Sequence, residues 1–176
     1  KMGLIRYVMS LMNGARVAIS AQALGIAEAA FREARQYASE RQQFKQTIDA
    51  FPAIYDMLAR MKANLVAVRT LLYETTKAVD LRNCYTRACD DPAKQTAETR
   101  EKMKYYTEIA SVLTPMSKAF STEAANSICY DCLQIHGGTG YMHDFDAERL
   151  YRDARITNIY EGTTQLQVVA AIGGIM

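Results

Sequence analysis

A single acidic residue stands at a predicted turn near the end of the chain. Glu161 lies between Tyr160 and Gly162, directly before Thr163 and Thr164; we call residues 160–162 the acidic turn. Glycine permits the backbone of a tight turn, and threonine often precedes a helix. A carboxylate held there and shielded from water can act as a general base. It could equally be an acid that only complements the dipole of the following helix.

A glycine-rich segment lies upstream of the acidic turn. Residues 134–141 read Gln-Ile-His-Gly-Gly-Thr-Gly-Tyr. Paired glycines let a backbone come close to a ligand and donate N–H groups to it. Gly137 and Gly138 could also simply end a helix. Residues 149–155, Arg-Leu-Tyr-Arg-Asp-Ala-Arg, join the two segments, and we expect Arg152, Asp153 and Arg155 to form an ion-pair network that fixes the acidic turn.

Two arginines in the first 41 residues are further candidates. Arg16 lies in an alanine-rich apolar row, where an ion pair between helices would be the ordinary reason for it. Arg41 follows the first predicted helix, and a positive charge there complements the helix dipole. Its planar guanidinium also suits a diphosphate, which it can bind through two parallel hydrogen bonds.

Metal sites are not expected. The cysteines are Cys84, Cys89, Cys129 and Cys132. A three-residue spacing inside a long helix is a poor zinc knuckle, so we expect free thiols in a reduced, cytoplasmic compartment. A di-iron bundle needs a glutamate three residues before a histidine, and neither His136 nor His143 has one.

The charge and hydropathy of the sequence argue against nucleic-acid-binding proteins and membrane-spanning proteins. The 21 basic and 19 acidic residues give a net charge of +2 and are spread along the chain, which argues against a nucleic-acid partner. No apolar run approaches the ~20 residues that span a bilayer. A chain of 176 residues is expected to form one domain.

Helical periodicity of apolar residues runs through nearly the whole chain and predicts an all-α fold. Asp91-Pro92 is a candidate start for the third helix, and Pro115 should kink or split it. Residues 41–51 read as a polar loop. Three long helices and a final one predict an up-down four-helix bundle. The predicted helices cover about 2–40, 52–81, 92–136, 146–154 and 163–172.

These strings, in this order, resemble the C-terminal helical domain of the acyl-CoA dehydrogenase family. The resemblance is strongest over 134–168, and it fails over about 82–114, where this chain is longer than common members. It implies that residues 1–176 are one helical domain from the C-terminal part of a longer protein. The family's N-terminal helical domain and middle β-domain are absent, so the chain alone is expected to be inactive.

The resemblance also implies the chemistry. Members are FAD-dependent oxidoreductases that introduce a double bond into acyl-CoA thioesters and pass electrons to electron-transfer flavoprotein. The glutamate of the acidic turn removes the α-proton, and its backbone N–H binds the thioester carbonyl. Glu161 is then the catalytic residue, because Ala15 stands where other members carry their base. An acyl-CoA oxidase and a non-catalytic helical scaffold remain alternatives.

The same resemblance implies two sets of binding residues. Arg41 would bind the pyrophosphate of a flavin in the neighbouring subunit, since members are homodimers or homotetramers. Lys45 stands where members usually carry glycine. The implied substrate-binding residues are Asn13, Arg16, Tyr160 and Gly162. The implied cofactor-binding residues are Arg41, Gln43, Phe44, Gln134, Ile135, His136, Gly137, Gly138, Thr163, Thr164 and Gln165.

Overall fold

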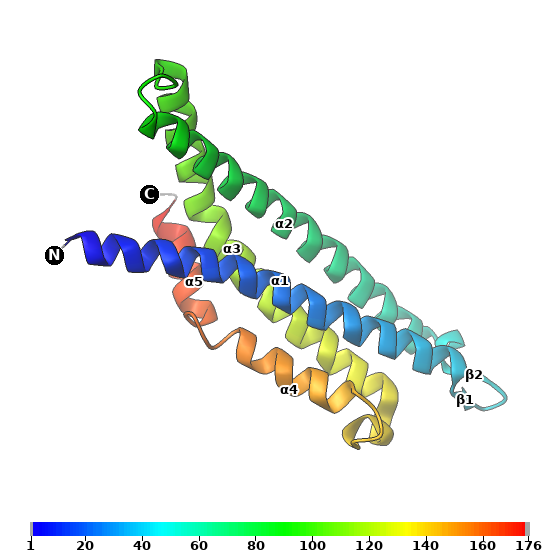
Figure 1. The fold of residues 1–176 in the computed structure, drawn as a ribbon. Coiled ribbons are helices and arrows are strands. Elements are labelled where there is room, and N and C mark those ends of the chain that lie inside the picture. The colour runs from blue at the N-terminus through cyan, green and yellow to red at the C-terminus, as the bar shows by residue number, and fades with distance from the viewer. Residues whose placement is uncertain (1, 175–176) are drawn as a thin grey trace.

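Three long helices run antiparallel to one another in the computed structural model, which describes residues 2–174, with side chains from residue 14 onward. Each long helix reverses the direction of the one before it (Figure 1), so the predicted up-down, all-α bundle is confirmed. The elements are α1 (Met2–Glu40), β1 (Gln42–Gln43), β2 (Gln46–Thr47), the 3-10 helix η1 (Ile48–Ala50), α2 (Pro52–Asp90), α3 (Ala97–His136), the 3-10 helix η2 (Gly137–Tyr141), α4 (Ala147–Thr157) and α5 (Thr164–Gly173).

Two short helices share the fourth place in the bundle. α4 packs against α1 and α3, and α5 packs against α3. The connection between them is visible as a turn in the ribbon (Figure 1). Glu161 and Gly162 in that turn have φ angles of 53° and 97°. A right-handed helix cannot continue through such residues, so the backbone of the acidic turn itself divides the fourth helix.

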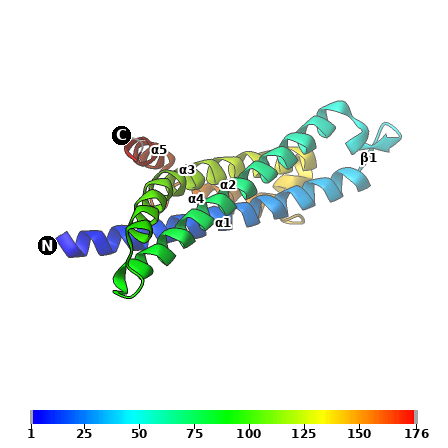
Figure 2. The same ribbon diagram turned by 90° about the horizontal axis from the view of Figure 1, so that it is seen from above.

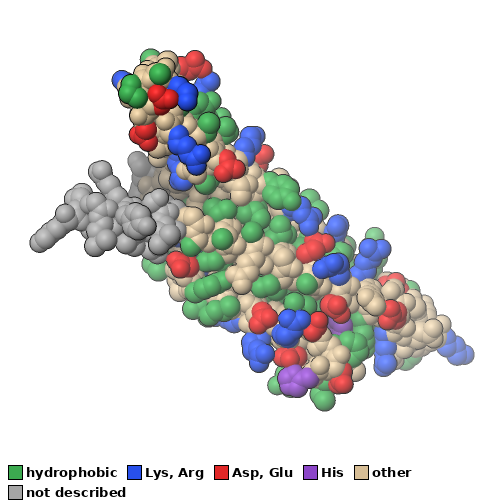
Figure 3. Space-filling view, viewed as in Figure 1, with side chains coloured by type: hydrophobic (Ala, Val, Ile, Leu, Met, Phe, Trp, Pro, Cys, Tyr) green, Lys and Arg blue, Asp and Glu red, His purple; other side chains and the backbone are tan. Residues whose placement is uncertain are grey.

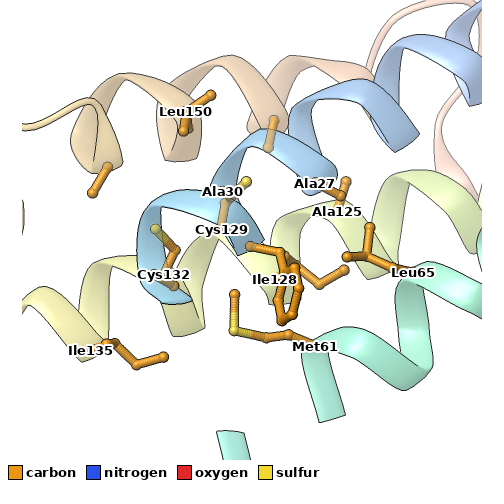
Figure 4. Packing of buried hydrophobic residues seen from close by; sticks show 14 of the residues in the cluster. Ala27, Ala30, Met61, Leu65, Ala125, Ile128, Cys129, Cys132, Ile135 and Leu150 are labelled. Atoms are coloured by element: carbon orange, nitrogen blue, oxygen red, sulfur yellow. The ribbon is translucent and has the colours of Figure 1, made fainter. Parts of the chain in front are cut away.

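Small side chains form the α1 side of the hydrophobic core. They recur every three or four residues, as a helix face requires, and allow close approach of the neighbouring helices. The buried alanines of this row are Ala23, Ala27, Ala30, Ala34 and Ala38. They pack with larger residues of α2, α3 and α4 (Figure 4), among them Met61, Leu65, Ile128, Cys129, Cys132 and Leu150.

Two of the free thiols are part of this core. Cys129 and Cys132 are fully buried, and burial raises the pKa of each to about 12, whereas Cys84 is exposed on α2. Only the thiolate is nucleophilic. We therefore expect iodoacetamide at pH 8 to label Cys84 in the folded protein and to spare Cys129 and Cys132 until denaturant is added. Timed labelling followed by peptide mass spectrometry measures this, and equal labelling of the three thiols without denaturant would contradict it.

The predicted junction between the second and third helices is wrong. α2 continues past Leu81 to Asp90, and α3 begins at Ala97 rather than at Asp91-Pro92. Thr96 and Thr99 form a reciprocal capping box, in which each threonine hydroxyl accepts the other residue's backbone N–H, at 3.1 and 2.8 Å. Near this junction α2 and α3 pack against each other outside the bundle. Each helix therefore buries only one narrow face there and does not need the apolar periodicity of a helix in the bundle core.

The tip of this helical pair is held by aromatic stacking. The rings of Tyr85 and Tyr106 lie parallel, with centroids 5.7 Å apart. α3 also passes through the buried Pro115 without being split, and its ribbon curves along its length (Figure 2). The curvature agrees with a proline that removes one helical hydrogen bond.

Charged side chains of both signs are interspersed with apolar ones on the face shown in Figure 3. Within residues 2–174, no helix combines the length and hydropathy that crossing a membrane requires. The same part of the chain holds no cluster of three metal-ligating side chains.

Candidate active site

The acidic turn presents its carboxylate to the outside of the bundle. The Glu161 side chain is exposed, and no hydrogen bond or ion pair to another described residue holds it. The left-handed backbone of Glu161 and Gly162 turns the chain between α4 and α5. A second molecule or domain that covers the turn would have to remove water from this carboxylate before it became a strong base.

Two fully buried side chains bind all three carbonyl groups of the acidic turn. Lys118 of α3 donates from Nζ to the Tyr160 carbonyl at 3.0 Å and to the Gly162 carbonyl at 2.5 Å. Gln167 of α5 donates from Nε2 to the Glu161 carbonyl at 3.2 Å and to the Gly162 carbonyl at 3.1 Å. The carbonyl oxygens therefore point into the bundle.

The direction of these carbonyls fixes the direction of a backbone donor. The peptide bonds are trans, and in a trans peptide the N–H points opposite to the C=O. Because the Tyr160 carbonyl points toward Lys118, the Glu161 N–H of the same peptide points away from it. No hydrogen bond among the described residues uses that N–H. The turn thus carries a carboxylate and an unused N–H donor on the same residue.

Further hydrogen bonds anchor both sides of the acidic turn. Glu123 of α3 accepts from the Asn158 amide at 3.0 Å and from the Thr164 hydroxyl at 2.5 Å. The Tyr160 hydroxyl donates to the side chain of Gln22 on α1. Three helices therefore contribute to holding the connection between α4 and α5.

Four charged groups influence one another below and beside the turn. Burial lowers the pKa of Lys118, the positive charge of Arg16 lowers it further, and the carboxylates of Glu123 and Glu161 act in the opposite direction. Arg16 is buried, as its place in the alanine row predicts. The side chain of Asn13 lies outside the described residues.

The predicted ion-pair network of Arg152, Asp153 and Arg155 does not hold the acidic turn. Arg149 lies 3.0 Å from the Asp146 carboxylate and 4.0 Å from that of Asp153. Arg155 donates to the Asn158 side chain. These contacts join residues of α4 and its ends, and buried groups on α3 and α5 bind the turn instead.

A small hairpin replaces the loop predicted for residues 41–51. β1 and β2 pair antiparallel, with Phe44 and Lys45 between them. Both tip residues have left-handed backbones, with φ of 50° and 71°, as a tight hairpin turn requires. Glycine adopts the left-handed conformation of Lys45 without strain, which agrees with the glycine that the resemblance implies at this position.

Arg41 and Gln43 meet the glycine-rich segment in a surface hollow of about 460 Å³, which we call the hairpin hollow. Phe44 is outside its lining; its exposed ring packs edge-on against Phe51. Gln134 is also exposed and does not line it. The lining consists of Tyr37, Arg41, Gln43, Ile48, Ile135, His136, Gly137, Gly138 and Thr139.

His136 forms the buried wall of the hairpin hollow. Its ring stacks on Tyr37 with centroids 4.2 Å apart, and Nδ1 donates to the Cys132 carbonyl at 2.8 Å. Nε2 is then the acceptor nitrogen of the neutral ring. It is buried with no hydrogen-bond partner among the described residues.

Gly140 lies behind this wall and leaves no room for a side chain. A Cβ at Gly140 would lie 2.6 Å from Cβ of His136 and 2.9 Å from the Leu133 carbonyl, whereas a Cβ at Gly138 would meet nothing within 4 Å. We expect Gly140→Ala to destabilise the fold by about 1–3 kcal/mol and Gly138→Ala to leave it within about 0.5 kcal/mol. Thermal unfolding of the two variants compares them directly, and equal melting temperatures would contradict this packing.

The acidic turn and the hairpin hollow lie far apart on one chain. The turn contacts α1 at Gln22, and the hollow contacts it at Tyr37. Fifteen residues of helix separate these points by about 22 Å. In Figure 1 the α4–α5 connection and the β1–β2 hairpin lie at different places along the bundle. The predicted flavin contacts Thr163, Thr164 and Gln165 lie with the acidic turn, at the start of α5.

Sequence reasoning missed Lys118 and Gln167. A usable signal existed for Lys118, because it falls on the buried face of α3 with Thr114, Ser121 and Ala125. A lysine on a core row must find acceptors inside the protein. For Gln167 no comparable signal exists, since glutamine is an ordinary residue in a helix.

The fold and these two clusters define a helical domain that presents a carboxylate at the α4–α5 connection and a surface hollow beside the β1–β2 hairpin. A family model described as acyl-CoA dehydrogenase, C-terminal domain, matches residues 5–172. The chain belongs to the acyl-CoA dehydrogenase family, of which it contains the C-terminal domain.

Named relatives agree with this family. An acyl-CoA dehydrogenase of Bacillus subtilis is 40% identical over 159 residues, which are 90% of this chain and 35% of that protein. The caffeyl-CoA reductase-Etf complex subunit CarC of Acetobacterium woodii is 34% identical over 168 residues, 96% of this chain and 38% of the relative. A solved acyl-CoA dehydrogenase complexed with FAD from Bacillus anthracis has a TM-score of 0.78 and 30% identity, with 96% of this chain and 28% of that chain covered. The chain thus spans well under half of each.

Proposed function

We propose that this chain is the C-terminal helical domain of a longer flavin-dependent enzyme that desaturates acyl-CoA thioesters at the α and β carbons. The observation that carries the proposal is the acidic turn. One residue there combines a solvent-facing carboxylate with a backbone N–H that no described group uses. Family membership and the match to a dehydrogenase that is 40% identical support the same reaction.

The chemistry needs both groups of Glu161. Its carboxylate removes the α-proton of the thioester, and its N–H binds the thioester carbonyl as negative charge develops on that oxygen. A fixed backbone donor needs no reorganisation during the reaction, which is why such groups lower barriers effectively. Flavin, when bound, supplies the acceptor for the β-hydride. Arg16, Tyr160, Gly162 and Asn13 would bind the substrate beside the turn.

The residues of the hairpin hollow fit the diphosphate and adenosine end of FAD. Arg41 brings a guanidinium for phosphate, and Gly137 and Gly138 leave open space above their backbones. The unpartnered Nε2 of His136 is an acceptor that an N–H donor from a ligand could use, as on adenine. We propose Arg41, Gln43 and Ile135–Gly138 for that end, with Phe44 and Gln134 at its edge. Thr163, Thr164 and Gln165 would contact the flavin end.

The same site can run in the opposite direction, and one relative favours this second candidate. That relative is a caffeyl-CoA reductase subunit. By microscopic reversibility Glu161 would then protonate the α-carbon of an enoyl thioester. The name of that relative also supports electron-transfer flavoprotein as the redox partner. An oxidase that uses oxygen instead would share these residues of the helical domain.

We propose that the complete protein is cytoplasmic and forms homodimers or homotetramers. Leu166, Val169 and Ile172 on α5 are more than half exposed. Such apolar side chains favour burial against further domains or subunits. Residues 82–114 would then be a lengthened tip relative to common members, outside the reacting site.

The test is an anaerobic titration of the complete polypeptide that carries this domain. Its flavin absorbance is followed while acyl-CoAs from butyryl to palmitoyl are added, and in parallel the reduced protein is mixed with the matching 2-enoyl-CoAs. Bleaching by one acyl-CoA supports the dehydrogenase, and fast reoxidation by an enoyl-CoA favours the reductase direction. A flavoprotein that responds to neither would overturn the proposed function.

A further inference from the structure

We infer that Lys118 is a positioning residue for the proposed reaction, because it fixes the orientation of the peptide that carries the Glu161 N–H. This inference rests on the proposed function. Lys118 reaches two carbonyls on opposite sides of Glu161, those of Tyr160 and Gly162. It is fully buried, so these carbonyls are bound from inside the bundle.

Lys118 and Gln167 bind different sets of carbonyl groups in the acidic turn. Both bind the Gly162 carbonyl, and Gln167 alone binds that of Glu161. Among the described residues, Lys118 alone binds the Tyr160 carbonyl. That carbonyl belongs to the same rigid peptide as the Glu161 N–H. Loss of Lys118 would therefore release this one peptide plane, while Gln167 still held the next two carbonyls.

The positive charge of Lys118 also strengthens the Glu161 N–H as a hydrogen-bond donor. A peptide whose carbonyl accepts a hydrogen bond from a cation is polarised, and the N–H on its other side becomes a stronger donor. In the proposed reaction that N–H faces the oxygen on which negative charge develops. Burial and the positive charge of Arg16 lower the pKa of Lys118, and the carboxylates of Glu123 and Glu161 act in the opposite direction.

Among the described residues, the hydrogen bonds of the Lys118 amine all go to the acidic turn, at the carbonyls of Tyr160 and Gly162. The surrounding face of α3 carries small side chains without charge, such as Thr114, Ser121 and Ala125. A buried amine is costly unless it is fully hydrogen-bonded, and an apolar side chain of similar volume would fill the space without that cost. The acidic turn is the group that gains from the lysine.

Lys118→Met in the complete polypeptide tests the inference. Methionine keeps the length and the apolar stem but has no donor. The matched control is Thr122→Val, one turn further along α3, since the buried Thr122 hydroxyl bonds only to carbonyls of its own helix. Stopped-flow absorbance measures flavin reduction by the preferred acyl-CoA. Infrared difference spectra measure the carbonyl band of bound 2-enoyl-CoA labelled with ¹³C at the thioester carbon.

We expect Lys118→Met to slow flavin reduction about 100-fold, the size of effect that a misplacement near 1 Å can have. Acyl-CoA affinity should change by less than the rate. The labelled carbonyl band should move toward its frequency in water, because its N–H donor is no longer fixed. Thr122→Val should match the wild-type rate within about threefold and keep the band in place.

The other outcomes separate this inference from the proposed function. A wild-type rate and an unmoved band in Lys118→Met would overturn the positioning role and leave the proposed function standing. A wild-type protein that no acyl-CoA or enoyl-CoA affects would overturn both. If Lys118→Met does not fold, Lys118→Arg replaces it. The wider, planar guanidinium keeps the charge but must displace the Tyr160 carbonyl, so an unmoved band there would also overturn the inference.

Discussion

Replacing Glu161 with glutamine is expected to slow flavin reduction by the preferred acyl-CoA by about 10³-fold or more, because the variant lacks a base for the α-proton. The change keeps the size of the side chain and leaves the backbone N–H in place. Thioester binding through that N–H should therefore persist, with affinity within a few-fold of wild type. Stopped-flow absorbance of the complete polypeptide gives the rate, and equilibrium titration gives the affinity.

The control for this variant is Asp153→Asn. Asp153 is an exposed carboxylate on α4 that lies 4.0 Å from Arg149 and does not contact the acidic turn. It should keep the wild-type rate, so a loss in Glu161→Gln alone would identify one carboxylate among its neighbours. A Glu161→Gln protein that reduces its flavin at the wild-type rate would show that another group removes the proton.

The first long helix and the bundle could be predicted because apolar residues recur with helical periodicity and without interruption. The alanine row of α1 has no proline, and Glu40 is the last helical residue as predicted. The end of α2 could not be predicted from periodicity, because residues beyond Leu81 pair with a single neighbouring helix. Their sequence retains helix-forming residues without a complete apolar face. Thr96, not Asp91, caps α3.

The residues of the candidate site could be predicted where the residue type itself indicates a chemical role. Glu161 and Arg41 are charged groups beside glycine or at a helix end, and the sequence alone draws attention to both. The attachment of the acidic turn was not predictable. Between Lys118 and Glu161 lie the remainder of α3, η2 and α4, and Gln167 follows Glu161 in the first turn of α5. Only the packing of α3 against α5 brings both donors to the Gly162 carbonyl.

Arg41→Gln is the second variant with a large expected effect. We expect it to weaken FAD affinity of the apoprotein by about 30- to 100-fold, the loss of charge-assisted hydrogen bonds to a diphosphate. Lys45→Gln is the matched control, since Lys45 is an exposed cation on the same hairpin outside the lining of the hairpin hollow. Fluorescence titration of both apoproteins with FAD measures the difference. Equal losses in both variants would point to general charge rather than to the hollow.

The separation of about 22 Å along α1 between the acidic turn and the hairpin hollow makes this variant a test of assembly as well. If the hollow serves the flavin of the partner subunit, Glu161→Gln and Arg41→Gln fall in the same site of a mixed dimer and leave its other site unchanged. One of its two sites would then combine an intact base with an intact Arg41 of the partner subunit. Unfolding and refolding the two variants together at limiting FAD should restore activity to about a quarter of wild type, the share expected for random pairing in a twofold dimer. If both residues act on the flavin of their own chain, no mixed dimer holds an intact site, and activity should stay at the sum of the two variants alone.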